Sequence, residues 1–310
     1  MSLTLIYKAH KRRFLKKCAT LLEKIKYNRG LILSEFHGQL SKMTVTLPAN
    51  NDPVDYQMVL GEQRVAMTPL IGQKIELKYA GEIHCVACDR RIKKSYSGGY
   101  CFPCSQKLAR CDLCIMKPET CHYGAGTCRE PEWGEAFCMQ DHIVYLANSS
   151  GIKVGITRIN QIPTRWIDQG ASQALPIFRV KSRLQSGLVE VIFKSHVSDR
   201  TDWRKMLKGK PEDVDLLAIR DQLMLESSEQ ILALQQRFGE QAIMPLDNQD
   251  VVDISFPVQQ YPDKVKSFNF DKTPEISGIL CGIKGQYLIF DTGVINIRKF
   301  TGYNITVVVE

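Results

Sequence analysis

The stretch CVACDRRIKKSYSGGYCFPC, residues 85–104, contains two C-x2-C pairs separated by twelve residues. Each pair is typical of a tight knuckle that brings two thiolates together, and two facing knuckles supply four sulfur ligands. Four thiolates favour zinc over magnesium or calcium, because those two ions prefer oxygen ligands. Cys85, Cys88, Cys101 and Cys104 therefore predict a structural zinc site; an iron–sulfur centre or unligated thiols are the alternatives.

The residues between the two pairs have the length of a hairpin arm with a Ser-Gly-Gly tip at 97–99. Basic side chains on this arm would hold phosphate, and Tyr96 and Tyr100 would stack on a base. The arm is therefore a candidate nucleic-acid contact, and a solvated hairpin explains the same residues equally well. Its basic residues are Arg90, Arg91, Lys93 and Lys94.

A second group of ligand-type residues follows directly. Cys111 and Cys114 form a third C-x2-C pair, which predicts a second zinc ion. Spacing alone does not decide which residues complete that site; the candidates are Cys121, His122, Cys128, Cys138 and His142. A closed site with four protein ligands has no position for water, so we expect both ions to stabilise the fold rather than to catalyse.

Composition bounds the class of protein. The chain has 310 residues, of which 44% are hydrophobic and 24% charged, as in ordinary globular proteins. This mix excludes a collagen-like, coiled-coil or wholly disordered chain, and the length predicts two or three domains. Nine of the 11 cysteines lie in residues 85–138, which favours metal binding over disulfides. No apolar run approaches the ~20 residues of a membrane helix, so we expect a cytoplasmic protein without a membrane partner.

The net charge of +8 is unevenly distributed. Residues 1–30 and 142–210 are strongly basic, whereas residues 211–240 are acidic. Basic segments point to a polyanion, since each contact with phosphate releases counterions. The sequence therefore predicts nucleic acid as a partner, DNA more than RNA, and leaves a protein partner for the acidic segment; a solvated charged face is the alternative.

The pattern of elements predicts an α+β fold. We expect a zinc-ribbon block followed by a small antiparallel sheet with helices, flanked by β-rich N- and C-terminal segments that pair with one another. The predicted units are a basic arm (1–30), a β-rich segment (31–80), the cysteine block (81–141), a strand–helix unit (142–210), an acidic helix (211–240) and a β-rich C-terminal segment (241–310).

The strand–helix unit carries residues suited to chemistry. Alternation along residues 142–148 and 152–157 predicts a hairpin with Tyr145, Lys153 and Thr157 on one polar face. A helix with Arg165 and a strand with Arg179 and Lys181 follow, and these cations extend the predicted nucleic-acid contact. Glu190 then lies in an apolar helical run, so its carboxylate must be paired, metal-bound or protonated. A pair with Lys194, four residues on, is the simplest arrangement.

The order Ile143-Val144-Tyr145, Lys153-Val154-Gly155, Arg165-Trp166 and then Glu190 resembles the GIY-YIG nuclease superfamily, over roughly residues 142–207. The whole chain also resembles an uncharacterised bacterial family that places cysteine knuckles before such a core. The superfamily resemblance implies that Tyr145 is a general base or orients water, and that Arg165 steadies the scissile phosphate. It also implies that Glu190 holds a single Mg²⁺ or Mn²⁺ ion.

Two positions depart from the superfamily pattern. Ile143 stands where the first motif has glycine, and Lys153 stands where the second motif has tyrosine. Lysine binds phosphate but accepts a proton only when it is desolvated. Short phage-type members of the superfamily often carry lysine at this position.

Three functions fit these observations. The leading hypothesis is a zinc-stabilised nuclease that acts on DNA and depends on a divalent metal, with Tyr145, Lys153, Arg165 and Glu190 as catalytic residues. A second is a nucleic-acid-binding protein without catalysis, in which Lys153 and Arg165 bind phosphate. A third is an assembly module that binds another protein through the cysteine block and the acidic helix.

Overall fold

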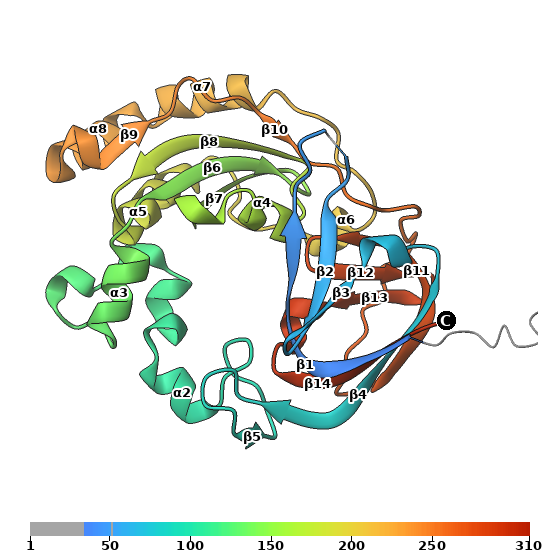
Figure 1. The fold of residues 1–310 in the computed structure, drawn as a ribbon. Coiled ribbons are helices and arrows are strands. Elements are labelled where there is room, and N and C mark those ends of the chain that lie inside the picture. Colours follow the sequence, from blue (N-terminus) through green and yellow to red (C-terminus); the bar gives the residue numbers. More distant parts are fainter. Residues whose placement is uncertain (1–33, 51) are drawn as a thin grey trace, which may run out of the picture.

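Two antiparallel sheets organise the chain. The computed structural model describes residues 34–50 and 52–310, and the predicted basic arm (1–30) lies outside them. Figure 1 shows the five-stranded sheet at the top and the nine-stranded sheet at the right. The cysteine block runs along the bottom and left side, so that the three parts surround a central space. The fold is therefore mixed α+β, as the sequence predicts.

The nine-stranded sheet joins the two ends of the described chain. Its strand order is β13-β12-β11-β4-β14-β1-β2-β3, with β5 paired to β4. Strand β1 pairs with β14 from Ser34↔Val309 to Gln39↔Asn304, so the N- and C-terminal β segments build one sheet. The strands are β1 (Ser34–Thr46), β2 (Asp55–Leu60), β3 (Gln63–Ala66), β4 (Lys74–His84), β5 (Arg91–Ile92), β11 (Glu275–Lys284), β12 (Tyr287–Phe290), β13 (Gly293–Asn296) and β14 (Tyr303–Val309).

The five-stranded sheet has β6 and β8 at its centre. Its order is β10-β8-β6-β7, with β9 paired to β8, and Tyr145 of β6 lies opposite Gly155 of β7. The strands are β6 (His142–Asn148), β7 (Ile152–Arg158), β8 (Gln173–Val180), β9 (Ile243–Pro245) and β10 (Val252–Asp253). Helices α4 (Thr164–Asp168) and α5 (Arg183–Phe193) follow β7 and β8 respectively.

Both faces of the five-stranded sheet are buried, which corrects the prediction of an open polar face. Val144 and Leu146 point into a core shared with α5 and the acidic region. Tyr145 and Ala147 point into a second core, which the nine-stranded sheet completes. All seven residues of β6 are consequently buried, as expected for a strand covered on both sides.

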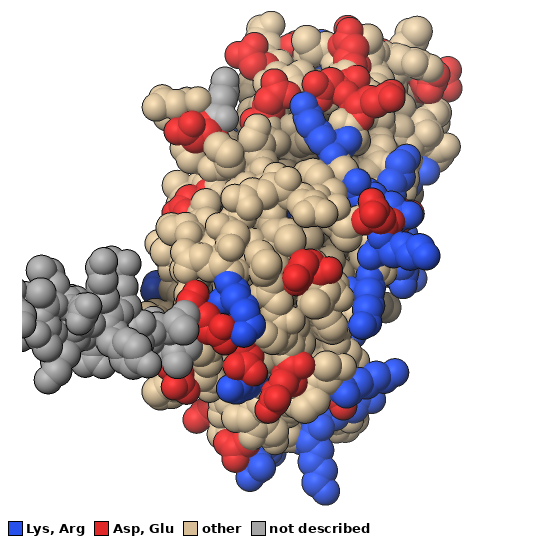
Figure 2. Space-filling view, turned by 90° about the vertical axis from the view of Figure 1, so that its right-hand side faces the viewer, with Lys and Arg blue, Asp and Glu red and all other residues tan. Residues whose placement is uncertain are grey.

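The predicted acidic helix is two helices. Helix α7 (Leu216–Glu226) begins at Leu216 because the Asp215 carboxylate accepts hydrogen bonds from the N–H groups of Leu217 (3.1 Å) and Ala218 (2.9 Å). The chain turns at Ser227, and α8 (Ser228–Phe238) follows. Figure 2 shows acidic side chains gathered at the upper end of the molecule and basic ones along one edge of the view.

The remaining helices are short. They are α2 (Phe102–Lys107) and α3 (Pro131–Cys138) in the cysteine block, and α6 (Trp203–Met206) after α5. No helix in the described part of the chain is long and apolar enough to cross a membrane.

Candidate metal centre and adjoining cavity

The four cysteines of the first two knuckles meet at one point. Their sulfur atoms all lie within 4.8 Å of one another. The sulfurs of Cys88 and Cys101 are 3.8 Å apart. Two sulfurs on one tetrahedral zinc ion, each at ~2.3 Å, are also separated by about 3.8 Å. The residues Cys85, Cys88, Cys101 and Cys104 thus fit a zinc ion without rearrangement.

Backbone amides support negative charge on these sulfurs. The N–H of Cys101 donates to the Cys85 sulfur at 3.1 Å, and the N–H of Cys104 donates to the Cys101 sulfur at 3.4 Å. Burial alone would raise the pKa of Cys85, but hydrogen bonds from the backbone at Cys101, Ala87 and Cys88 lower it to about 6. The hydrogen bond with Cys101 raises the pKa of Cys104 to about 12, so in the absence of metal the knuckles favour the thiolate form at Cys85 and the thiol form at Cys104. Thiolate is the form that binds metal.

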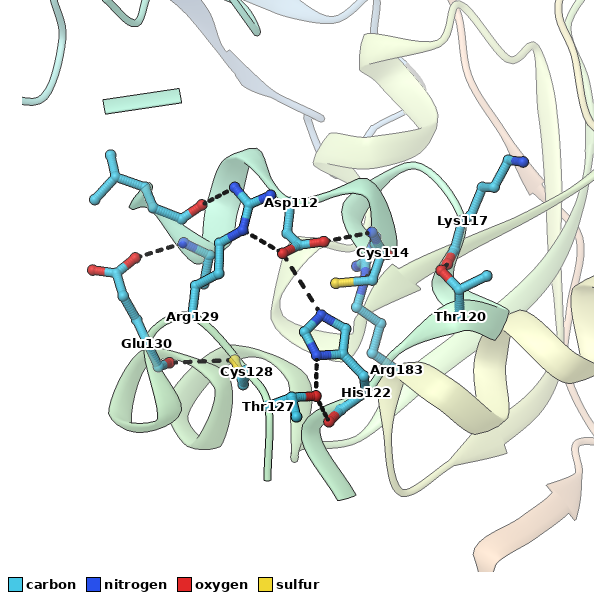
Figure 3. A network of polar contacts seen from close by, with 12 residues as sticks. Asp112, Cys114, Lys117, Thr120, His122, Thr127, Cys128, Arg129, Glu130 and Arg183 are labelled. Carbon is cyan, nitrogen blue, oxygen red and sulfur yellow. Dashed lines mark hydrogen bonds and ion pairs between the residues drawn. The ribbon is translucent and has the colours of Figure 1, made fainter. Parts of the chain in front are cut away.

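The second group of cysteines gathers around a separate small cavity. Cys114, Cys121, Cys128 and Cys138 line it together with His122. Ligand atoms of Asp112, Cys114 and His122 lie within 4.8 Å of one another. Figure 3 shows that Arg129 and His122 both face the Asp112 carboxylate, at 2.6 Å and 3.6 Å respectively.

Two predicted candidates lie outside this lining. Cys111 does not border the cavity, although Cys114 of the same knuckle does. His142 begins β6 and is fully buried; its Nδ1 lies 2.7 Å from the carbonyl of Gln140, and Nε2 has no hydrogen-bond partner among the described residues. Burial lowers the pKa of His142 to about 4, so the ring is neutral at physiological pH.

A larger cavity of about 530 Å³ lies between the three parts of the chain. The five-stranded sheet and its helices supply Arg158, Arg165, Arg183 and Glu190 to its lining. The nine-stranded sheet adds Lys42 of β1, and the short helix η8 (Ile297–Phe300) that precedes β14 adds Arg298. Sequence analysis missed Lys42 and Arg298, since each occurs in an ordinary β-rich stretch far from the recognisable motifs.

The charge of this cavity is strongly positive. Seven Lys or Arg side chains and three carboxylates line it, which leaves an excess of four positive charges. Each carboxylate already has a lysine partner: Asp168 pairs with Lys42, while Glu190 and Asp199 share Lys194. By contrast, four arginines of the lining form no ion pair with any residue of the described ranges 34–50 and 52–310. They are Arg158, Arg165, Arg183 and Arg298.

Glu190 borders the cavity from helix α5. It is only 8% exposed, and burial raises its pKa, while Lys194 at 3.4 Å partly offsets this. The pair with Lys194 is the arrangement expected from their spacing.

Tyr145 and Lys153 lie behind the cavity rather than in its lining. The Tyr145 hydroxyl is fully buried and donates to the side-chain oxygen of Gln169 at 2.9 Å. Burial raises the pKa of Tyr145 to about 12, so the phenol keeps its proton near neutral pH. Burial, followed by repulsion from Arg165, lowers the pKa of Lys153 to about 8. Both groups therefore stay largely protonated near pH 7.

The predicted nucleic-acid contacts fall on different surfaces. Arg179 and Lys181 of the β8 region both pair with Asp141, whose carboxylate compensates one of their two positive charges. On the zinc hairpin, Arg91 pairs with Glu82 at 3.3 Å and Lys94 lies 5.4 Å from the Tyr96 ring centroid. Lys153 is 3% exposed. The structure therefore does not unite these seven residues in one binding face.

One protein family matches most of the chain. The family, described as "Protein of unknown function (DUF2797)", matches residues 72–305, which include both cysteine groups and the large cavity's lining except Lys42. The chain belongs to the DUF2797 family. Neither a curated protein nor a solved structure matches it. DUF2797 membership fixes no activity, so function rests on the geometry of the cavity.

Proposed function

We propose that this DUF2797 protein is a zinc-stabilised nuclease that hydrolyses phosphodiester bonds in the large cavity. The supporting observation is that three arginines without ion pairs, Arg158, Arg165 and Arg298, line the same 530 Å³ space as the carboxylate of Glu190. The guanidinium of Arg183 also borders this space, but it donates to the carbonyl oxygens of Cys114 and Ile115. Unpaired guanidinium groups bind phosphate in a forked geometry and stabilise charge that develops during phosphoryl transfer. The strand and helix order that resembles the GIY-YIG superfamily is consistent with this chemistry.

The reaction would proceed by attack of a water oxygen on phosphorus. The bond to the leaving sugar oxygen breaks, and that oxygen takes up a proton. Arg165 would stabilise the negative charge on the phosphate oxygens, and Glu190 would hold a divalent ion. When bound, this ion acidifies a water molecule and polarises the phosphate. Lys153, with a pKa of about 8, lies behind the cavity and keeps most of its positive charge near pH 7, which adds to the positive potential at the phosphate, and the proton of the attacking water passes to solvent.

The role of Tyr145 differs from that implied by the superfamily resemblance. A fully buried phenol that donates to Gln169 does not meet an attacking water. We propose that Tyr145 positions α4, since its ring packs edge-on against Trp166 with centroids 5.9 Å apart. The same burial favours the second candidate function, which is binding of nucleic acid without cleavage.

The cysteine block has a structural part in this proposal. Zinc at Cys85, Cys88, Cys101 and Cys104 would close the hairpin. A second ion would use Cys114 together with other ligand-type residues that line the smaller cavity, which are Asp112, Cys121, His122, Cys128 and Cys138. Elemental analysis should give two zinc ions per chain. A result of one zinc ion per chain would contradict the second zinc site.

A cleavage assay tests the proposal. Zinc-loaded protein is incubated with labelled single-stranded and duplex DNA in the presence of Mg²⁺ or Mn²⁺. We expect Glu190→Gln to slow cleavage by about 100-fold, which is typical when one group that stabilises developing charge is removed. Glu229→Gln is the matched control, because Glu229 is exposed on α8 and outside the cavity. Binding without any metal-dependent cleavage by the wild-type protein would support the second candidate instead.

A further inference from the structure

The large cavity has one apolar wall. The cysteine block contributes Ile115, Met116 and Pro118 to its lining. Met116 is 80% exposed, although it belongs to a densely structured segment. A flexible thioether on the wall of a basic cavity is suited to contact a flat apolar surface such as a nucleobase.

The guanidinium groups of Arg165 and Arg298 come from different sheets. Arg165 lies on α4 beside the five-stranded sheet, and Arg298 lies on η8 before β14. Desolvation and then the nearby charge of Arg165 lower the pKa of Arg298, so the two cations repel one another. The carboxylate of Asp168 partly offsets this repulsion at Arg298, but it is already paired with Lys42. A bound anion between the two arginines would reduce their repulsion further.

Three parts of the chain line the cavity, which is partly open to solvent. Residues of β1, the cysteine block and α5 all line it, and Figure 1 shows these elements on different sides of the central space. Its volume of about 530 Å³ falls within the range of small-ligand sites. A DNA duplex is stiff over about 150 base pairs and cannot bend into such a space, whereas a single strand can enter with its base unstacked.

We propose that the cavity binds one nucleotide of a single strand, with its phosphate between Arg165 and Arg298 and its base against Ile115 and Met116. This proposal takes the site from the proposed function and adds the form of the substrate. It assigns Arg298 as a phosphate-binding residue and Met116 as a base-contacting residue.

Binding measurements without divalent metal test this inference separately from cleavage. Fluorescence anisotropy compares a labelled single-stranded oligonucleotide with the duplex of the same length, using zinc-loaded protein. We expect the single strand to bind at least tenfold more tightly. Arg298→Gln should weaken its binding about tenfold and reduce the slope of log affinity against log salt by about one. Met116→Ser should weaken binding severalfold without changing that slope.

Lys299→Gln is the matched control. Lys299 follows Arg298 on η8, is exposed, and lies over the Phe300 ring rather than in the cavity. Equal binding of duplex and single strand, or equal effects of Arg298→Gln and Lys299→Gln, would overturn the inference. Cleavage of duplex DNA that requires Glu190 would overturn it while supporting the nuclease. Tight single-strand binding without cleavage would support it while overturning the nuclease.

Discussion

The contact between the cysteine block and helix α5 leads to a prediction about Gly187. This glycine faces the chain at Pro118 and Glu119, and a Cβ atom there would lie 2.3 Å from the Glu119 nitrogen and 2.6 Å from the Pro118 carbonyl carbon. Both are backbone atoms, so no side chain can rotate away. Gly187→Ala should therefore push the block away from α5.

The size of the effect follows from two opposing contributions. Alanine favours a helix interior over glycine by about 1 kcal/mol. Forcing an extra methyl group into a packed contact costs about 1–3 kcal/mol, and rigid backbone neighbours place this case at the upper end. We expect a net loss of about 2 kcal/mol in the free energy of unfolding.

Urea denaturation of zinc-loaded protein measures this loss. Gly124→Ala is the control, because Gly124 lies in the same block and a Cβ atom there meets nothing within 4 Å. Gly187→Ala should also weaken single-strand binding, since Ile115 and Met116 would move with the block. A Gly187→Ala protein as stable as wild type, or more stable, would refute the close docking of the block on α5.

Three further outcomes are expected. Chelation of zinc should expose residues 85–104 to protease, because zinc binding contributes folding free energy; an unchanged digestion pattern would contradict the first metal site. Asp141→Asn should release Arg179 and Lys181 and steepen the salt dependence of nucleic-acid binding by up to about two; an unaltered slope would exclude this surface. Stability should rise from about pH 8 to pH 10.5, since in this window the unfolded state holds protons that folded Lys153 and Lys284 have lost. In pH-dependent urea denaturation Lys153→Met should reduce this rise by about half, because Lys284 still contributes the remainder; a wild-type-like profile would contradict the lowered pKa of Lys153.

Much of the fold could be predicted from local patterns in the sequence. The two C-x2-C pairs predicted four sulfurs at one point, since a short knuckle leaves the chain few alternatives. Strand positions in the strand–helix unit also followed from alternation; β6, for example, covers His142–Asn148 as predicted. The antiparallel pairing of β1 with β14 agrees with the expectation that the two ends associate.

Features that depend on packing between segments far apart in the sequence could not be predicted from local patterns. Alternation gave Lys153 and Tyr145 a polar face, but the nine-stranded sheet covers that face and buries both. Lys42 and Arg298 are separated by more than 250 residues along the chain, and only the folded arrangement brings both to one cavity. Spacing likewise could not separate Cys111 from the cysteines that line the smaller cavity.

The central claim is that Glu190 and the unpaired arginines form a metal-dependent phosphodiester site. Electron paramagnetic resonance of Mn²⁺ tests it most directly, with zinc-loaded protein and a phosphorothioate oligonucleotide that resists cleavage. We expect the free Mn²⁺ signal to fall when the oligonucleotide is added to the wild-type protein. Glu190→Gln should abolish this fall, whereas Glu229→Gln should preserve it. Equal Mn²⁺ binding by wild type and Glu190→Gln would contradict the account.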